Sequence, residues 1–115
     1  AFGKEPSSNK TRPSWVNSLE VMIRDMWNEP LSLSDLSTAV GVHPVTISKS
    51  FPKYFGCTFG EYVRRLRIER SLNGVLRRGA ALTDIALDSG FADHSHFTRT
   101  FKQLTGMLPT HLRSF

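Results

Sequence analysis

The sequence predicts an all-α fold with about seven helices, and three observations lead to this fold class. Apolar residues recur every three or four positions through most of the chain, which is the spacing of one helix face. Residues typical of helix starts, mainly Ser, Thr and Asp, precede these stretches, and Gly follows them. No stretch of similar length alternates apolar and polar residues as a strand would. The 115 residues, 39% hydrophobic and 22% charged, suffice for one or two small folding units.

The first helix follows a polar stretch. Residues 1–13 have no periodic pattern, so we expect a flexible tail or the remnant of a linker, with the domain itself in residues 14–115. A helix is predicted from Ser14 onward because four apolar residues lie at helical spacing, namely Val16, Leu19, Ile23 and Met26. Proline disfavours helical geometry in the residue before it, so this helix should end before Pro30.

The first helix-turn-helix unit is predicted over about residues 32–56. Ser32 and Asp35 have the spacing of a capping box, which opens a short helix that Gly41 ends. Pro44 then takes the first position of a second helix, where its missing N–H costs nothing.

Pro52 lies inside the second helix of this unit. A proline at an interior position removes the hydrogen bond to the carbonyl four residues earlier, here that of Ser48, and costs about 3 kcal/mol. We therefore expect this helix to be short or bent.

A long linker helix is predicted over about residues 58–76. Thr58 and Glu61 form the capping box that opens it. Gly74 within it costs roughly 1 kcal/mol relative to alanine, so we expect its last turn to fray.

A second helix-turn-helix unit follows over about residues 82–106. Its short helix ends at Gly90, and Asp93 is placed to cap the helix after it. Pro109 then opens a final short turn.

The two units are related as an internal repeat. The offset between matched residues is 49 positions before the turn and 50 after it. The matched pairs are Leu33 with Leu82, Leu36 with Ile85, Gly41 with Gly90, Ile47 with Phe97, Phe51 with Phe101, and Gly56 with Gly106. Two copies are too few for a solenoid, so we interpret them as a duplicated helix-turn-helix unit.

The second helix of each unit has an apolar face and an outward face. Outward positions are Val45, Ser48 and Lys49 in the first copy, and Ser95, Thr98, Arg99 and Lys102 in the second. Small, polar and basic side chains suit a helix that enters the major groove of DNA. A helical hairpin with an ordinary solvated face would have the same pattern.

Positive charge is concentrated in the later part of the chain. Residues 1–42 hold four Lys/Arg and five Asp/Glu, a net charge of −1, whereas residues 43–115 hold eleven and five, a net charge of +6. The net charge of +5 favours an anionic partner. The densest run is in the linker helix, at Arg64, Arg65, Arg67 and Arg70, and a solvated helix face explains it equally well. Arg67 is a candidate for pairing with Glu or Asp.

The sequence argues against several other classes of function. No apolar run is long enough for a membrane span, and no signal peptide is visible. Cys57 is alone, which predicts a buried or inert thiol, no disulfide and a reducing, cytoplasmic compartment. His94 and His96 point to different sides of a helix, so no metal site is predicted. Without a catalytic motif we predict neither enzyme activity nor a cofactor.

Residues 85–113 resemble the signature of the AraC/XylS family of bacterial transcription regulators. The matching positions are Ile85, Ala86, Gly90, Phe91, Phe97, Arg99, Phe101, Lys102, Gly106, Pro109 and Arg113. The resemblance is looser in the first half, where His43 replaces a small cap residue and Pro52 a basic one. It implies seven helices, with recognition helices at 44–55 and 94–105 that enter successive major grooves about 34 Å apart.

This resemblance and the outward faces together define the candidate DNA-binding residues. They are Val45, Thr46, Ser48, Lys49, Ser95, His96, Thr98, Arg99 and Lys102. Arg99 is the strongest candidate for base readout, because arginine pairs bidentately with guanine, and a phosphate contact is the alternative. For Lys49, a base contact and a phosphate contact are both open. For His96, the alternatives are a contact with DNA and a side chain that is simply exposed to solvent.

The predicted function is sequence-specific binding of double-stranded DNA by part of a transcription regulator. The resemblance makes RNA polymerase a further candidate partner. We expect an effector ligand and a dimer partner to be bound by a separate domain that is absent from this chain. The alternative function is a helix-turn-helix module that binds proteins and has no affinity for DNA.

Overall fold

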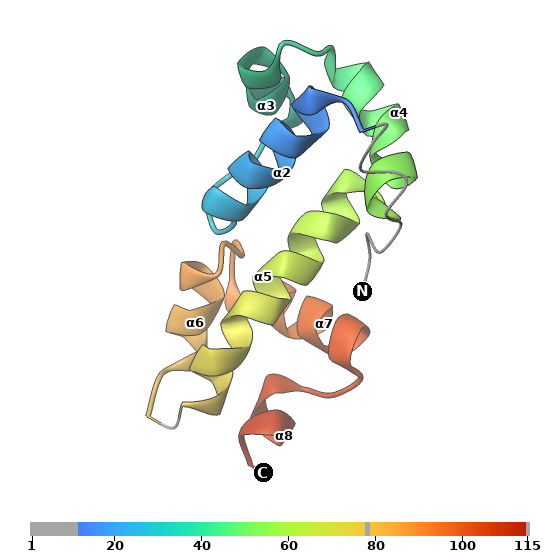
Figure 1. Ribbon diagram of the computed structural model, residues 1–115. Coiled ribbons are helices and arrows are strands. Elements are labelled where there is room, and N and C mark those ends of the chain that lie inside the picture. Colours follow the sequence, from blue (N-terminus) through green and yellow to red (C-terminus); the bar gives the residue numbers. More distant parts are fainter. Residues whose placement is uncertain (1–11, 78, 115) are drawn as a thin grey trace. The chain divides into compact units, whose positions relative to one another are not determined.

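The computed structural model describes residues 12–77 and 79–114, and within these ranges it contains seven helices and no strand. The helices are α2 (Ser14–Asp25), α3 (Leu33–Val40), α4 (Pro44–Phe55), α5 (Phe59–Leu76), α6 (Leu82–Asp88), α7 (His94–Thr105) and α8 (Pro109–Arg113), as labelled in Figure 1. The predicted all-α fold class is confirmed. Residues 1–11 of the expected tail lie outside the described residues. No helix in the described ranges is both long and apolar enough to cross a membrane.

The chain divides into two compact units. The first unit contains the chain up to Met26 and Pro30–Val63, and the second contains Trp27–Glu29 and the chain from Arg64 onward. Each unit therefore includes one helix-turn-helix pair, α3 with α4 or α6 with α7. The connector Trp27–Glu29 belongs to the second unit although it joins two helices of the first.

Helix starts are fixed by side-chain caps at the predicted positions. The N–H of Thr58 donates to Glu61 Oε1 at 2.9 Å, and the N–H of Glu61 donates to Thr58 Oγ1 at 3.2 Å. Asp93 Oδ1 accepts from the N–H of His96 at 2.8 Å, and Ser32 caps α3 in the same way. These bonds satisfy donors that have no partner in the first helical turn. The caps are local chemistry, which is why the sequence was sufficient to predict them.

Helix α4 is a full-length helix despite the proline inside it. It runs for 12 residues, the same length as α7, and ends at Gly56, whose N–H donates to the carbonyl of Pro52 at 2.9 Å. The expectation that Pro52 shortens this helix is therefore wrong. The turn after the proline is kept in place by packing, because Phe51 and Phe55 are both buried.

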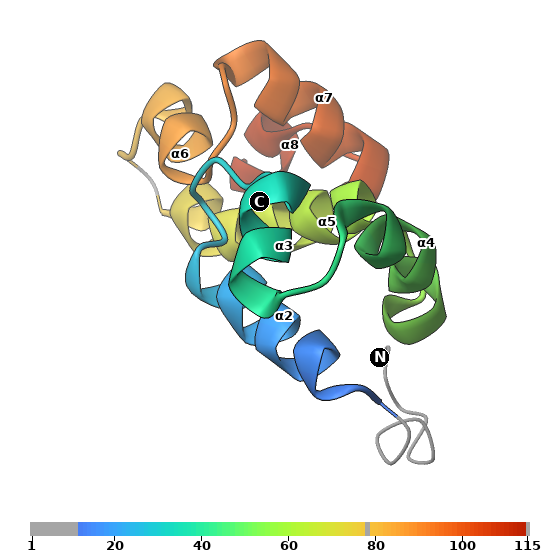
Figure 2. The same cartoon turned by 90° about the horizontal axis from the view of Figure 1, so that it is seen from above.

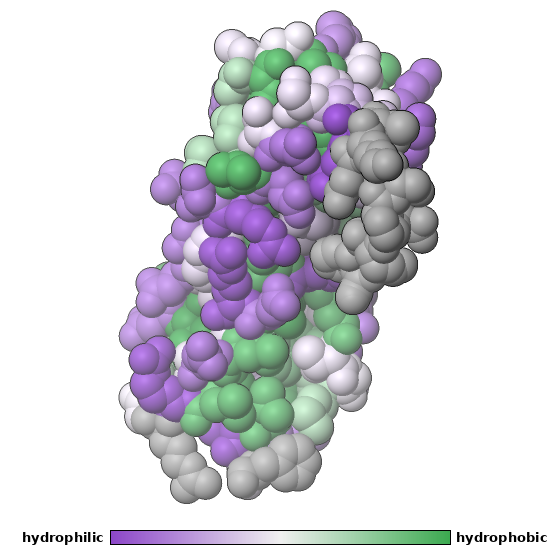
Figure 3. All heavy atoms as spheres, viewed as in Figure 1, coloured by the Kyte–Doolittle hydropathy of each residue, from purple (hydrophilic) through white to green (hydrophobic). Residues whose placement is uncertain are grey.

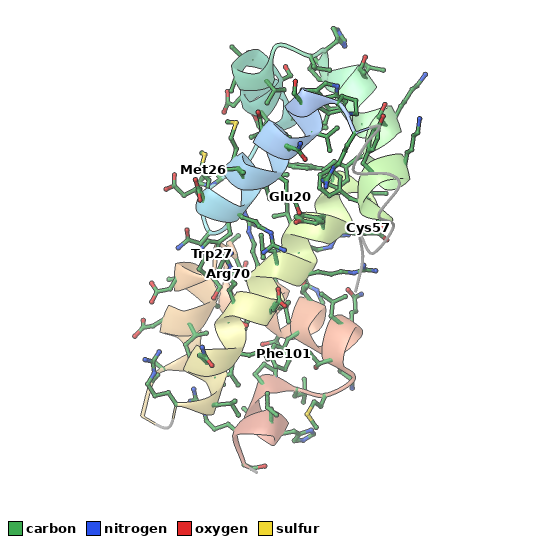
Figure 4. The ribbon with its side chains drawn as sticks, in the orientation of Figure 1. Glu20, Met26, Trp27, Cys57, Arg70 and Phe101 are labelled. Atoms are coloured by element: carbon green, nitrogen blue, oxygen red, sulfur yellow. The ribbon has the colours of Figure 1, made fainter. Side chains whose placement is uncertain are left out.

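The core of the first unit is rich in aromatic residues. The rings of Phe51 and Phe55 stack with centroids 4.1 Å apart, and Tyr62 meets both edge-on. Aliphatic residues from α2, α3 and α4 complete this core, namely Val16, Leu19, Ile23, Leu36 and Ile47. Cys57 is also buried, as expected; Figure 4 labels it at the end of α4.

The core of the second unit lies between α5, α6 and α7. It consists of Ile68, Val75, Ile85, Ala86, Phe91, Phe97 and Phe101. In Figures 1 and 2, α6, α7 and α8 gather along the later part of α5. A Cβ atom at Gly74 would lie 3.2 Å from the Ile85 side chain, so the glycine allows α6 to approach α5 closely. Helix α5 continues past Gly74 to Leu76, as predicted.

Arg113 closes the C-terminal end of α5. Its guanidinium donates from Nε to the carbonyl of Val75 at 2.8 Å, from Nη1 to that of Ala80 at 2.7 Å, and from Nη2 to that of Gly74 at 3.3 Å. The last carbonyls of a helix have no partner within it. Arg113 supplies those partners and thereby fastens α8 to the core.

Hydrophilic residues cover much of the face drawn in Figure 3, and hydrophobic ones gather over the end of α5. Leu76 is 55% exposed there.

Candidate nucleic-acid interface

The two helix-turn-helix units repeat with the predicted offset. Helix α4 begins at Pro44 and α7 at His94, and both end 11 residues later, so their boundaries differ by 50 positions. Within each unit the short helix packs against the second helix, α3 on α4 and α6 on α7. One face of each second helix is fully buried, through Ile47 and Phe51 in α4, and Phe97 and Phe101 in α7.

The outward face of α4 presents the four predicted residues to solvent. Val45, Thr46, Ser48 and Lys49 are all exposed, with Val45 at 51%. His43 caps this helix, because its Nδ1 accepts from the N–H of Val45 at 3.1 Å. An imidazole thus replaces the usual small cap residue. The face combines an isopropyl group, two hydroxyls and one ammonium.

The outward face of α7 is more strongly cationic. Ser95, Arg99 and Lys102 are exposed, whereas His96 and Thr98 are half-buried. The His96 ring meets Phe91 edge-on, with centroids 5.3 Å apart, so this side chain rests against the core and its reach is limited. The Oγ1 atom of Thr98 is buried and lacks a hydrogen-bond partner among the described atoms.

A groove of about 450 Å³ runs along this face of α7. It is lined by Thr98, Arg99, Lys102, Gln103 and Leu108. The sequence-based prediction missed Gln103 and Leu108. Gln103 follows Arg99 by four positions and therefore lies on the same helix face, which is a signal that could have identified it. Leu108 precedes α8, and only the fold brings it beside α7.

The linker-helix arginines differ in role. Arg67 donates from Nε to the carbonyl of Trp27 at 2.9 Å and from Nη2 to that of Glu29 at 2.7 Å, and burial lowers its pKa. The expected pairing of Arg67 with a carboxylate is therefore wrong, because backbone carbonyls take its place. Arg70 lies over the Trp27 ring at 5.5 Å (Figure 4). Arg64 and Arg65 are exposed cations.

The same network encloses the turn between α6 and α7. The side-chain amide of Asn28 donates to the carbonyl of Asp88 at 2.9 Å. Gly90 has a φ of +90°, and a Cβ atom there would lie 2.9 Å from Arg67 Nε and 3.0 Å from the Asn28 carbonyl oxygen. This turn therefore has no room for a side chain. The described residues contain no cluster of three or more His, Cys, Asp or Glu that could hold a metal ion.

Comparisons with known proteins define the family. Residues 36–114 match the family described as "Helix-turn-helix domain". An uncharacterized HTH-type transcriptional regulator of Staphylococcus aureus is 36% identical over 98 residues, which are 85% of this chain and 13% of that protein. A transcriptional regulator from Chromobacterium violaceum, described as containing an AraC-type DNA-binding domain, has a TM-score of 0.78 at 24% identity and covers 88% of this chain and 90% of its own.

A further solved structure of the same fold was determined with DNA. The DNA-binding domain of AdpA, a global transcriptional factor, in complex with a target DNA, has a TM-score of 0.78 at 13% identity and covers 85% of this chain and 88% of its own. The fold and its duplicated units thus define a helix-turn-helix protein. The chain belongs to this helix-turn-helix family, and its fold is that of an AraC-type DNA-binding domain, in agreement with the resemblance found in the sequence. It spans 13% of the length of the Staphylococcus aureus relative.

Proposed function

We propose that this chain binds double-stranded DNA sequence-specifically, as the DNA-binding part of a bacterial transcription regulator. Helices α4 and α7 are the recognition helices and enter successive major grooves. One observation carries the proposal. Each unit buries one face of its second helix and leaves the opposite face, with small, hydroxyl-bearing and basic side chains, in solvent. A major groove is wide enough to admit such a helix and displays base edges to it.

The two faces suit different kinds of contact. On α7, Arg99 reads a guanine through paired hydrogen bonds, while Lys102 neutralises phosphate. On α4, Val45 contacts a thymine methyl group, and Lys49 reaches a base or phosphate. The shorter exposed polar side chains, Thr46, Ser48 and Ser95, and the half-buried His96 contact base edges or phosphates close to the helices. Thr98, whose Oγ1 atom is buried, donates no hydrogen bond to DNA.

Most of the affinity comes from phosphate contacts. Lys and Arg release counterions when they bind phosphate, so binding weakens as salt rises. A domain with roughly 6 phosphate contacts should have a slope near −5 in a plot of log affinity against log salt concentration.

The decisive experiment begins with a mobility shift on random duplex DNA at low salt. Bound sequences are then selected from a random pool, and footprinting tests whether two successive major grooves are covered. Arg99→Ala should weaken specific binding by about 1–3 kcal/mol and relax the preference at one base pair. Arg64→Ala is the control, because it removes an exposed charge from the linker helix. It should weaken binding to all sequences alike.

Two outcomes would contradict the proposal. Unchanged DNA mobility at low salt with excess protein would favour a protein-interaction module. Retardation without any selected sequence would leave only non-specific binding.

The wider roles rest on the family alone. We propose that the regulator acts on DNA in the bacterial cytoplasm, by binding and without a catalytic step. RNA polymerase is the proposed partner of the whole regulator. We assign effector binding and dimerisation to a domain outside this chain, and the Staphylococcus aureus relative is long enough to contain one.

A further inference from the structure

We propose that Arg12 is a positioning residue for the first recognition helix. It holds the last turn of α4 in place from outside the helix and does not itself contact DNA. The inference rests on the proposed function of α4, and every residue that carries it belongs to the first unit.

The last turn of α4 needs support from outside the helix. Pro52 has no N–H, so the carbonyl of Ser48 lacks its helical partner. Lys53, Tyr54 and Phe55 are therefore joined to the earlier turns by one hydrogen bond fewer than in an ordinary helix. The outward residues Ser48 and Lys49 lie just before this weakened point.

Two side chains from the start of the described chain contact this turn. The guanidinium of Arg12 lies over the Phe55 ring, with Cζ 5.1 Å from the ring centroid. Trp15 meets Tyr54 edge-on, with centroids 6.2 Å apart. A cation over an aromatic face is attracted to the electron density of the ring, and the attraction grows as water is excluded.

Arg12 is itself held by a charged network. Its Nη2 lies 3.0 Å from Glu20 Oε1, and the hydroxyl of Tyr62 donates to Glu20 Oε2 at 3.3 Å. Figure 4 labels Glu20 on α2, facing the start of α5. The Arg12 side chain is 15% exposed, against 41% for Arg24, which approaches the same carboxylate at 3.9 Å. Ion pairs are stronger when they are shielded from solvent.

An unsatisfied donor marks Arg12 as unusual. Its Nε atom is buried and has no hydrogen-bond partner among the described atoms. Such groups are rare in folded proteins because they cost free energy. The Nε atom stays shielded from solvent despite that cost because Glu20 and the Phe55 ring hold the side chain. Its loss should therefore loosen the turn after Pro52 and raise the entropic cost of fitting α4 into a groove.

The test compares three variants of the full chain. Arg12→Gln removes the cation from Phe55, Arg12→Lys restores it, and Arg24→Gln removes one charge beside Glu20 but leaves Arg12 in place. Amide hydrogen exchange at Tyr54, Phe55 and Gly56 is measured on the free protein. Affinity is measured on a selected duplex, and on a duplex in which only the half-site of α4 is scrambled.

We expect exchange in the last turn to be about 3-fold to 10-fold faster in Arg12→Gln, with little change in Arg24→Gln. Affinity for the intact duplex should fall by a similar factor, and the loss should vanish on the duplex with the scrambled α4 half-site. Arg12→Lys should lie between Arg12→Gln and the wild type in both measurements. Thermal unfolding verifies that each variant is folded.

Other results would overturn the inference. An equal loss of DNA affinity in Arg12→Gln and Arg24→Gln would mean that the change in net charge alone is responsible. Equal losses on both duplexes would mean general destabilisation. A wild-type chain that binds no DNA refutes the proposed function of α4, whereas unchanged exchange in Arg12→Gln refutes the role of Arg12 independently.

Discussion

Replacing Gly90 with alanine should destabilise the second unit far more than the same change at another helix end. Gly90 has a φ of +90°, where alanine costs about 1–2 kcal/mol. Its new Cβ would also lie 3.0 Å from the Asn28 carbonyl oxygen and 2.9 Å from Arg67 Nε. These approaches force Arg67 away from the carbonyls of Trp27 and Glu29, and hydrogen bonds to charged groups contribute about 1.5–3 kcal/mol each.

Adding the backbone strain to the loss of about one such bond gives roughly 3–5 kcal/mol for Gly90→Ala. Gly106→Ala is the matched control, since Gly106 has a φ of +85°, lies in the same unit and has nothing within 4 Å of its Cβ position. The control should cost only the strain, about 1–2 kcal/mol.

The assay is thermal unfolding followed by far-ultraviolet circular dichroism. A difference of 2–3 kcal/mol between the variants corresponds to a melting temperature lower by roughly 8–15 °C in Gly90→Ala. Equal melting temperatures for the two variants would refute the reasoning, because the close approach to Arg67 and Asn28 would then cost nothing.

Three further predictions concern stability. Arg113→Met removes the partner of two carbonyls at the end of α5 and of the Ala80 carbonyl after it, so urea unfolding should report a loss of about 2–4 kcal/mol, and a loss below about 1 kcal/mol would contradict the capping role. Pro52→Ala restores the partner of the Ser48 carbonyl, so helix content by circular dichroism and unfolding free energy should rise together, the latter by about 1–3 kcal/mol; a fall in both would mean that the proline fits this helix. Burial, and then Glu20, raise the pKa of Tyr62 above its ordinary 10.0, so the folded state keeps the phenol proton that the unfolded chain releases. The resulting stability is complete below about pH 10 and is lost as the pH rises through the folded pKa; Tyr62→Phe should have a shallower decline in unfolding free energy at alkaline pH, and an identical decline would rule out this contribution.

Local chemistry explains why most of the fold could be predicted from the sequence. In each of the capping pairs Thr58–Glu61 and Asp93–His96, the two residues are three positions apart in the sequence. The glycines that end α4 and α7 are the residues that directly follow these helices. The buried and outward faces of both recognition helices follow from the helical period. Such features need no knowledge of distant residues.

The features of the fold that could not be predicted depend on contacts between residues far apart in the sequence. Arg67 and Arg113 bind backbone carbonyls 33 to 40 positions away, and no sequence pattern indicates which carbonyls a folded chain leaves unpaired. Pro52 was judged by helix propensity alone, but aromatic packing keeps the helix intact. Gly74 was likewise interpreted as a weak point, whereas it is the place where Ile85 approaches α5.

The candidate site was predictable to the same extent. Helical periodicity and the family resemblance together identified seven residues that are exposed in the structure, but they could not anticipate that Phe91 holds the His96 ring or that the Thr98 hydroxyl is buried. The position of the His96 ring depends on Phe91, a residue of the preceding turn.

The connector Trp27–Glu29 has a consequence for protein engineering. A chimera that exchanged recognition units between two relatives by a single crossover in the middle of α5 would take this tripeptide from one parent and its arginine anchor, Arg67, from the other. A functional graft must therefore transplant two separate pieces of sequence. For the same reason, a fragment that begins at the crossover would lack Trp27–Glu29, the connector that belongs to the second compact unit.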